Sequence, residues 1–368
     1  MTLHPDIAQL VKVLGDPNAA RHLTDGQWSA LIATARGNNL LGALADSLKQ
    51  TGVFAARQAQ RHLDGALQLS ARQHQSVLWE VHQLLAALGS LQIPVLLLKG
   101  AAYVISNHAV ARGRLFGDID LLVPRESLGN VESRLMVDGW VSATASTYDQ
   151  RYYREWMHEL PPMVHMRRGT VIDIHHTILP LTAGNAPDPT QIVDRSTPAP
   201  IPGPAMLRIP CPEDLVIHSL THLVHEGELH NGLRDLRDID CMLRDFGSTN
   251  NFWNRFTACA AGNDLAWPVG FGLLLAKRFF GTPVPDQVLS NLLRTKPNRY
   301  RAKMLGFVYA SALQSANLPN SGIWAGITRW LVFVRAHALR MPLSMLVRHL
   351  TIKAWISWRD TKREPHKQ

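Results

Sequence analysis

Two aspartates, Asp118 and Asp120, interrupt an apolar stretch in the segment DIDLLVP, residues 118–124. Residues two apart on a β-strand project from the same face. A strand here would therefore place both carboxylates side by side, while Ile119 and Leu121 point into the core. Two neighbouring carboxylates repel each other, and burying them costs free energy unless a cation or a hydrogen-bond partner compensates. The spacing predicts a site that holds positive charge between the two acids.

A third acid, Asp173, lies in the similar stretch TVIDIH, residues 170–175, with apolar residues on both sides. We expect this stretch to form a strand beside the first one. Three carboxylates from two adjacent strands would hold one or two magnesium ions, with manganese as the alternative, because such hard cations prefer oxygen ligands. Two such ions would clamp the phosphates of a nucleotide and activate an attacking hydroxyl group.

Three residues that precede the two aspartates are suited to binding phosphate: Lys99, Gly100 and Arg114. A glycine at a strand-to-helix turn lets the backbone approach a phosphate closely, and the helix N-terminus behind it favours anions. Lys99 would add a point charge, and Arg114 a planar fork that matches phosphate oxygens. A DxD or a KG alone is a weak signal, whereas their ordered combination with strands, a helix and an arginine is specific.

Hydrophobic periodicity divides the chain into four parts. Residues 1–90 have apolar residues at helical spacing. Short apolar runs alternate with helical stretches through residues 91–195, which predicts a small mixed α/β core. Residues 196–212 contain six prolines and should form an extended connection rather than a helix. Residues 213–368 are helical again and end in a basic tail.

Within the core we expect a mixed sheet of four or five strands from residues 91–176, with a hairpin that turns at Arg168 and Gly169. Such a sheet is too small to enclose a nucleotide by itself, and one of its faces needs cover. We therefore predict that the helices of residues 1–90 and 213–280 pack on either side of it and leave a cleft over the carboxylates. The expected fold class is α+β.

These ordered motifs resemble the nucleotidyltransferase fold of the DNA polymerase β superfamily. They are more closely similar to an uncharacterised bacterial nucleotidyltransferase family, whose motifs appear here as LLKG at 97–100, RLFGDIDLLVP at 114–124 and IDIHHTI at 172–178. The resemblance covers most of residues 25–245. It implies a nucleotidyltransferase core flanked by N-terminal and C-terminal helical units.

The resemblance also implies an activity and roles for the site residues. The activity would be magnesium-dependent transfer of a nucleotidyl group from a nucleoside triphosphate (NTP) to an acceptor. The implied metal ligands and catalytic residues are Asp118, Asp120 and Asp173. Lys99, Gly100 and Arg114 would surround the phosphates.

The acceptor stays open at this point. A small molecule, a sugar or a peptide in a biosynthetic or tailoring pathway is favoured over RNA. Two alternatives remain: a toxin-type nucleotidyltransferase acting on RNA or protein, and a catalytically silent nucleotide-binding protein.

Four further residues are secondary candidates because they lie on elements expected to face the cleft: His175, His222, Arg234 and Asp238. His218, His222 and His225 follow one another at i, i+4 and i+7 on a single predicted helix. Because that helix is amphipathic and has no HExxH motif, we expect one or two of these histidines to face the nucleotide cleft rather than to bind a transition metal together.

Composition and charge set the remaining limits. The 368 residues are 46% hydrophobic and 18% charged, as in a folded globular protein. The three cysteines show no CxxC spacing, and the first residues show no secretory signal, so we expect a cytoplasmic protein with reduced thiols. We see no stretch of about eighteen uncharged apolar residues, so a membrane-spanning helix is not expected.

The net charge is +9, and residues 321–368 contain nine Lys or Arg against two acids. The rest of the chain is close to neutral, which argues against a protein that coats nucleic acid uniformly. For the tail itself, a helix that packs on the body with its arginines reaching out to solvent is favoured over peripheral contact with a membrane.

Overall fold

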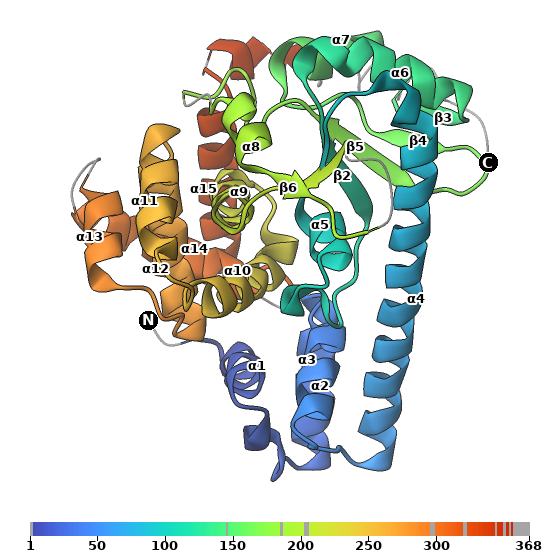
Figure 1. The fold of residues 1–368 in the computed structure, drawn as a ribbon. Coiled ribbons are helices and arrows are strands. Elements are labelled where there is room, and N and C mark those ends of the chain that lie inside the picture. Colours follow the sequence, from blue (N-terminus) through green and yellow to red (C-terminus); the bar gives the residue numbers. More distant parts are fainter. Residues whose placement is uncertain are drawn as a thin grey trace.

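The structure is a computed structural model that describes residues 3–144, 146–184, 187–201, 206–294, 299–318, 322–342, 344–348, 351–352 and 355. One mixed sheet lies between two groups of helices (Figure 1). The α+β fold class predicted from the sequence is confirmed.

The sheet has seven strands in the order β3-β4-β5-β2-β1-β7-β6. Their bounds are β1 (Val95–Leu97), β2 (Asp118–Leu122), β3 (Trp140–Ser142), β4 (Met163–His165), β5 (Val171–His175), β6 (Thr197–Pro198) and β7 (Leu207–Ile209). The central strand β2 runs antiparallel to β1 and parallel to β5. Strands β4 and β5 form the predicted hairpin, and Gly169 in its turn adopts a positive φ of 70°.

Residues 91–176 contribute five strands, β1 to β5, as predicted, and the proline-rich segment adds β6 and β7, which were not expected. Strand β7 pairs in parallel with β1, with Val95 opposite Leu207. Leu207 and Ile209 are 4% and 5% exposed, and the strand that contains them has no proline, so its N–H groups are available for the ladder. The segment is extended as expected, but part of it belongs to the sheet.

The N-terminal helices lie beside and below the sheet in Figure 1, and the longest of them runs along its side. They are α1 (Pro5–Gly15), α2 (Asp25–Gly37), α3 (Leu41–Gln50) and α4 (Arg57–Leu88). Thr24 and Gln27 form a capping box that begins α2, since each side chain bonds the other's backbone N–H. The predicted apolar stripe of α4 is buried: Val77, Val81, Leu84, Leu85 and Leu88.

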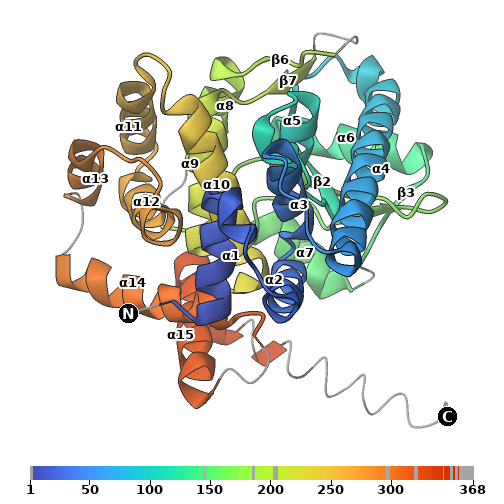
Figure 2. The same cartoon turned by 90° about the horizontal axis from the view of Figure 1, so that it is seen from below.

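The C-terminal helices lie on the other side of the sheet, as the two views agree (Figures 1 and 2). They are α9 (Pro212–His225), α10 (Gly232–Phe246), α11 (Phe252–Gly262), α12 (Ala266–Phe280), α13 (Asp286–Leu293), α14 (Arg299–Ser315) and α15 (Ile323–Arg340). The two flanking helical groups were predicted. Whether the four sequence ranges are separate folding units stays a prediction.

Short helices connect the strands of the core. They are α5 (Lys99–Ile105), α6 (Leu128–Val137), α7 (Thr147–Trp156) and α8 (Pro189–Arg195). Single 3₁₀ turns lie at Pro17–Ala20, Gly89–Leu91, Ala109–Ala111, Arg125–Ser127 and Leu229–Asn231.

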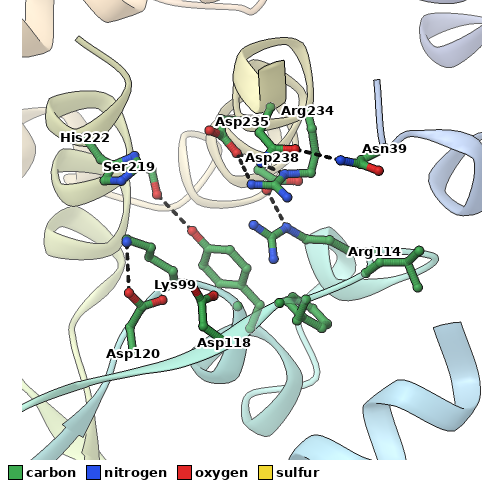
Figure 3. A pocket seen from close by; sticks show the side chains of 16 residues that line it. Asn39, Lys99, Arg114, Asp118, Asp120, Ser219, His222, Arg234, Asp235 and Asp238 are labelled. Carbon is green, nitrogen blue, oxygen red and sulfur yellow. Dashed lines mark hydrogen bonds and ion pairs between the residues drawn. The ribbon is translucent and has the colours of Figure 1, made fainter. Parts of the chain in front are cut away.

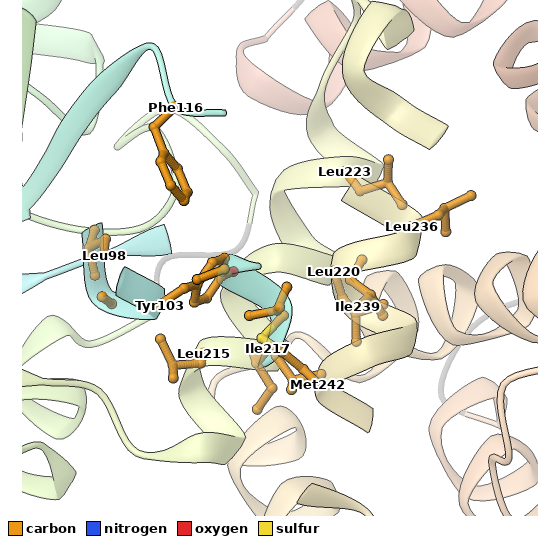
Figure 4. Packing of buried hydrophobic residues seen from close by; sticks show 14 of the residues in the cluster. Leu98, Tyr103, Phe116, Leu215, Ile217, Leu220, Leu223, Leu236, Ile239 and Met242 are labelled. Carbon is orange, nitrogen blue, oxygen red and sulfur yellow. The ribbon is translucent and has the colours of Figure 1, made fainter. Parts of the chain in front are cut away.

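A continuous apolar core joins the sheet to α9 and α10 (Figure 4). Tyr103 on α5 is 2% exposed and lies beside apolar residues of α9. Leu220 on α9 and Ile239 on α10 are both fully buried. Burying such side chains contributes about 1.5–3 kcal/mol each. The strands and helices that surround the candidate site are therefore held together by one packed core.

The described part of the basic tail packs on the body. Arg335 on α15 donates hydrogen bonds to the Val224 carbonyl at 3.0 Å and to the Tyr309 hydroxyl at 2.7 Å, and Arg340 bonds Glu226 at 3.1 Å. Trp330 on the same helix is 61% exposed. Within the described ranges, no helix has the length and apolarity needed to cross a bilayer. Residues 356–368 lie outside those ranges.

Candidate active site

The three predicted carboxylates lie on one face of the sheet. Strands β2 and β5 run parallel with Asp120 opposite Asp173, and Asp118 is two residues before Asp120, so all three side chains project the same way. Between them Ile119 is 2% exposed and points to the opposite face. The structure thus brings together the three acids that the sequence singled out, from positions up to 55 residues apart.

Two cationic or proton-donating groups hold Asp120. Lys99 Nζ is 2.9 Å and His175 Nε2 is 3.0 Å from the same oxygen, Asp120 Oδ1. Burial alone would raise the pKa of Asp120, but Lys99 and His175 outweigh it and hold that pKa well below its usual range. The cation expected between the acids is Lys99 in this structure.

The other two acids are shifted the opposite way. Burial, followed by the charge of Asp120, raises the pKa of Asp118. Burial, followed by the charges of Glu159, Asp120 and Asp118, raises the pKa of Asp173 to about 7. Asp120 is therefore firmly ionised, whereas Asp173 is poised to gain or lose a proton near neutral pH.

The turn after β1 is strained at Lys99. This residue has a φ of 41°, in the left-handed region that L residues other than glycine rarely adopt. The conformation begins α5 and lets the lysine side chain turn towards Asp120. Strain of this kind costs about 1–3 kcal/mol and is concentrated at functional sites.

Gly100 is required by the packing of its neighbours. A Cβ atom at this position would overlap the ring of Phe116 and approach Arg114 Nη1 to 2.9 Å. The Arg114 guanidinium lies over the Phe116 ring, 4.7 Å from its centroid. The structure therefore gives a further reason for glycine here, beside the close approach of a phosphate that the sequence suggested.

We expect Gly100→Ala to destabilise the protein by about 1–3 kcal/mol, because the added methyl group must displace an aromatic ring. Urea denaturation measures this change. Gly129→Ala on α6 is the matched control, since a Cβ there meets no atom within 4 Å and alanine favours helix. Equal stability of Gly100→Ala and Gly129→Ala would contradict the packing argument.

Arg114 is paired with a residue of the helical unit. Its Nε donates to Asp238 Oδ2 at 2.6 Å, and both side chains are about nine-tenths buried. Tyr103, whose ring centroid is 5.6 Å from the guanidinium, extends to α9, where its hydroxyl lies 2.8 Å from Ser219 Oγ. The ion pair and this hydrogen bond link the sheet to α9 and α10.

Asp238→Ala should destabilise the protein by about 3–5 kcal/mol, because it leaves the Arg114 charge buried without its partner. Asp245→Ala changes an exposed acid on the same helix and should alter stability by less than about 0.5 kcal/mol. Urea denaturation of both variants tests the link; a loss below about 1 kcal/mol for Asp238→Ala would show that the pair is dispensable.

These elements enclose an open pocket of about 420 Å³ (Figure 3). It has the size of a small-molecule site. Eight of the ten sequence-predicted residues line it: Lys99, Gly100, Arg114, Asp118, Asp120, His222, Arg234 and Asp238. The wall opposite the sheet comes from α9 and α10, which is the predicted arrangement.

The other two predicted residues lie behind the lining. His175 is 2% exposed and supports Asp120, and Asp173 is half-buried beside it. Of the three histidines on α9, only His222 lines the pocket, whereas His218 and His225 are buried. These three do not form a metal-ligand group among the described residues.

Sequence reasoning did not select seven polar or aromatic residues of the site: Asn39, Tyr103, Phe116, Ser219, Asn231 and Asp235 in the lining, and Glu159 beside the acids. Tyr103 lies four residues after Lys99, one turn along α5, which is a signal that helical spacing offers. Asn39 Nδ2 donates to Asn231 Oδ1 at 2.7 Å across 192 residues. Only tertiary contact reveals a pair so far apart.

The donor set fits a hard divalent cation. All three candidate ligands are carboxylates, and such oxygen donors suit Mg²⁺ and Mn²⁺. Asp173 Oδ1 is buried without a hydrogen-bond partner in the part of the chain that the structure describes. A buried acceptor in this condition is costly, and a cation between the strands would satisfy it.

Comparison with known proteins places the chain in a family. The model of a family described as "Uncharacterised nucleotidyltransferase" matches residues 24–281, which include the whole sheet, the pocket and helices α2 to α12. Searches of curated proteins and of solved structures gave no significant match. The chain therefore belongs to this nucleotidyltransferase family, and its general activity is that of a transferase.

Proposed function

We propose that this protein transfers a nucleotidyl group from an NTP to a hydroxyl-bearing acceptor, and that the reaction depends on magnesium, with manganese as a substitute. The main observation in support is the convergence of Asp118, Asp120 and Asp173 on one sheet face, next to a pocket that Lys99 and Arg114 also line. Carboxylates and cations at one opening suit a substrate that carries phosphates and divalent metal.

The three carboxylates would hold the metal. When bound, Mg²⁺ would orient the α-phosphate and lower the pKa of the acceptor hydroxyl, and pyrophosphate would leave. Asp173 would accept the acceptor's proton, because it lies opposite Asp120 on the sheet face where the metal would activate that hydroxyl group. Lys99 and Arg114 would neutralise phosphate oxygens, and α9 and α10 would position the base or the acceptor.

The pocket supports a small acceptor. Its lining is polar and comes from α9, α10 and the sheet, and no residue of the described tail, from 322 onward, is among the lining residues. An RNA-directed toxin would need the basic tail to face the cleft. We therefore favour a small molecule, a sugar or a peptide in a tailoring or biosynthetic pathway. We also propose a cytoplasmic location, supported by the three cysteines, which form no disulfide.

One contact favours the catalytically silent alternative. Lys99 forms an ion pair with Asp120, and this contact occupies an oxygen that a metal would need. In the active alternative the ammonium group moves to the phosphates once the metal binds. A nucleotide-binding protein without activity would keep the ion pair.

The test follows the two ends of the triphosphate. The purified protein is incubated with each of the four NTPs, labelled at the α- or the γ-phosphate, with Mg²⁺ or with a chelator, and with a panel of hydroxyl acceptors. We expect Mg²⁺-dependent transfer of the α-label and release of pyrophosphate. Transfer of the γ-label would identify a kinase instead. Calorimetric NTP binding without turnover of any acceptor would favour the silent alternative.

A further inference from the structure

A second group of potential metal ligands lies beside the three carboxylates. His158 and Glu159 follow α7, and His175 ends β5; Glu159 and His175 are paired in an isolated antiparallel bridge. The His158 carbonyl also accepts a hydrogen bond from the His176 N–H at 2.9 Å. Backbone pairing thus fixes the two histidines and the glutamate, and one ligand atom of each lies within 4.8 Å of the others.

The distances within this group suit a shared ion better than hydrogen bonds. Glu159 Oε2 is 3.4 Å from His175 Nδ1 and 3.6 Å from His158 Nε2. Good N–H···O hydrogen bonds are shorter, about 2.7–3.2 Å. In a tetrahedral zinc site with bonds of about 2.0–2.1 Å, two ligand atoms lie about 3.3–3.4 Å apart. The two contacts are therefore close to the edges of a tetrahedral site.

The orientation of His175 supports the same conclusion. Its Nε2 is 3.0 Å from Asp120 Oδ1 and donates to that carboxylate, and its Nδ1 lies 3.4 Å from Glu159 Oε2, where an ion that replaces the Nδ1 proton would find a lone pair. Nδ1 has no hydrogen-bond partner among the described residues, although the side chain is only 2% exposed. Histidines that bind metal commonly donate their other ring N–H to a carboxylate in this way.

The local charge also favours a cation. Four carboxylates interact here, since Glu159, Asp120 and Asp118 all act on Asp173. Lys99 forms its ion pair with Asp120, and Arg340 acts on Glu159 from a greater distance. Arg114 and Arg234 act on Asp118, but each of them is already paired with an acid of α10, Asp238 and Asp235. A further positive charge would lower the mutual repulsion of the carboxylates.

We propose that His158, Glu159 and His175 bind one divalent transition-metal ion, best matched by Zn²⁺, at a site separate from the magnesium site. Two imidazoles and a carboxylate suit Zn²⁺ better than Mg²⁺ and leave its fourth position for water. The ion fixes the His175 ring and through it the orientation of Asp120. His158 and Glu159 are thus positioning residues. The zinc site is independent of the proposed function, because it would bind zinc even in a protein that does not transfer nucleotidyl groups.

The test measures zinc affinity directly. The full-length protein, stripped with a chelator and held in excess Mg²⁺ to occupy the three aspartates, is titrated with Zn²⁺ against a fluorescent competitor. We expect one tight equivalent, weakened at least tenfold by His158→Ala and by the nearly isosteric Glu159→Gln. His82→Ala is the matched control, because His82 is exposed on α4, and it should bind zinc like the unmodified protein.

Two further measurements separate this site from the carboxylates. Asp118→Asn should keep its zinc affinity, and Co²⁺ added to the stripped protein should give a visible absorption band that His158→Ala removes. The proposal is wrong if the unmodified protein binds no zinc. It is also wrong if Glu159→Gln, shown by circular dichroism to be folded, binds zinc as tightly as the His82→Ala control. Loss of zinc binding in Asp118→Asn but not in His158→Ala or Glu159→Gln would likewise overturn it.

Discussion

Asp118→Asn is expected to lower magnesium-dependent nucleotidyl transfer by on the order of a hundredfold or more. Asp118 lies in the pocket lining beside Asp120, and replacing its carboxylate with an amide removes a charged metal ligand at nearly constant size. Because burial and Asp120 raise the pKa of Asp118, a neutral side chain should not weaken folding. Initial rates with the α-labelled NTP measure the loss.

The comparison with Asp120→Asn adds information about Lys99. That variant should be equally inactive but also less stable, because it leaves the partly buried Lys99 ammonium without its carboxylate partner. Asp138→Asn, an exposed change outside the pocket, should keep full activity and stability. Full activity of Asp118→Asn and Asp120→Asn would exclude the carboxylates as catalytic ligands, whatever the fate of the zinc site.

Without metal, ionisation of Asp173 should subtract stability as the pH rises from about 4 to about 7, while buried histidines with lowered pKa values, such as His218 and His225, act in the opposite direction. The pKa of Asp173 is about 7 in the folded protein, against 3.8 for an unperturbed aspartate. At Asp173 the folded state therefore binds more protons than the unfolded state in this window, so the contribution of this residue to the free energy of unfolding falls with pH. A difference of about 3 pKa units corresponds to about 4 kcal/mol at most.

Asp173→Asn should remove this part of the pH dependence and raise stability at pH 8 in the absence of metal. Urea midpoints across the pH range measure it, with Asp138→Asn as the control that keeps the unmodified profile. Added Mg²⁺ should stabilise the unmodified protein more at pH 8 than at pH 5, because the metal needs the ionised carboxylate. Profiles of Asp173→Asn and the unmodified protein that run parallel between pH 4 and 7 would show that Asp173 has no such shift.

Local sequence patterns predicted the strands of residues 91–176 and the faces on which their side chains lie. The two-residue period of DIDLLV and VIDIH assigns Asp118, Asp120 and Asp173 to one face, because alternate side chains of any strand point the same way. The same local logic predicted the hairpin at Gly169 and the apolar stripe of α4. These features depend on residues close together in the chain.

Tertiary structure alone decided which partner each charged group receives. Arg114 was expected at phosphates, and in this structure it pairs with Asp238, 124 residues away on α10. Lys99 pairs with Asp120, and Glu159 approaches Asp173 and His175 from a loop with no strand pattern of its own. Strand β7 joins the sheet from a segment whose prolines predicted only a connection. Such contacts arise from packing between distant elements, and neither periodicity nor spacing along the chain encodes them. The pKa of Asp173 depends on the same packing, because burial and three carboxylates from separate segments set it together.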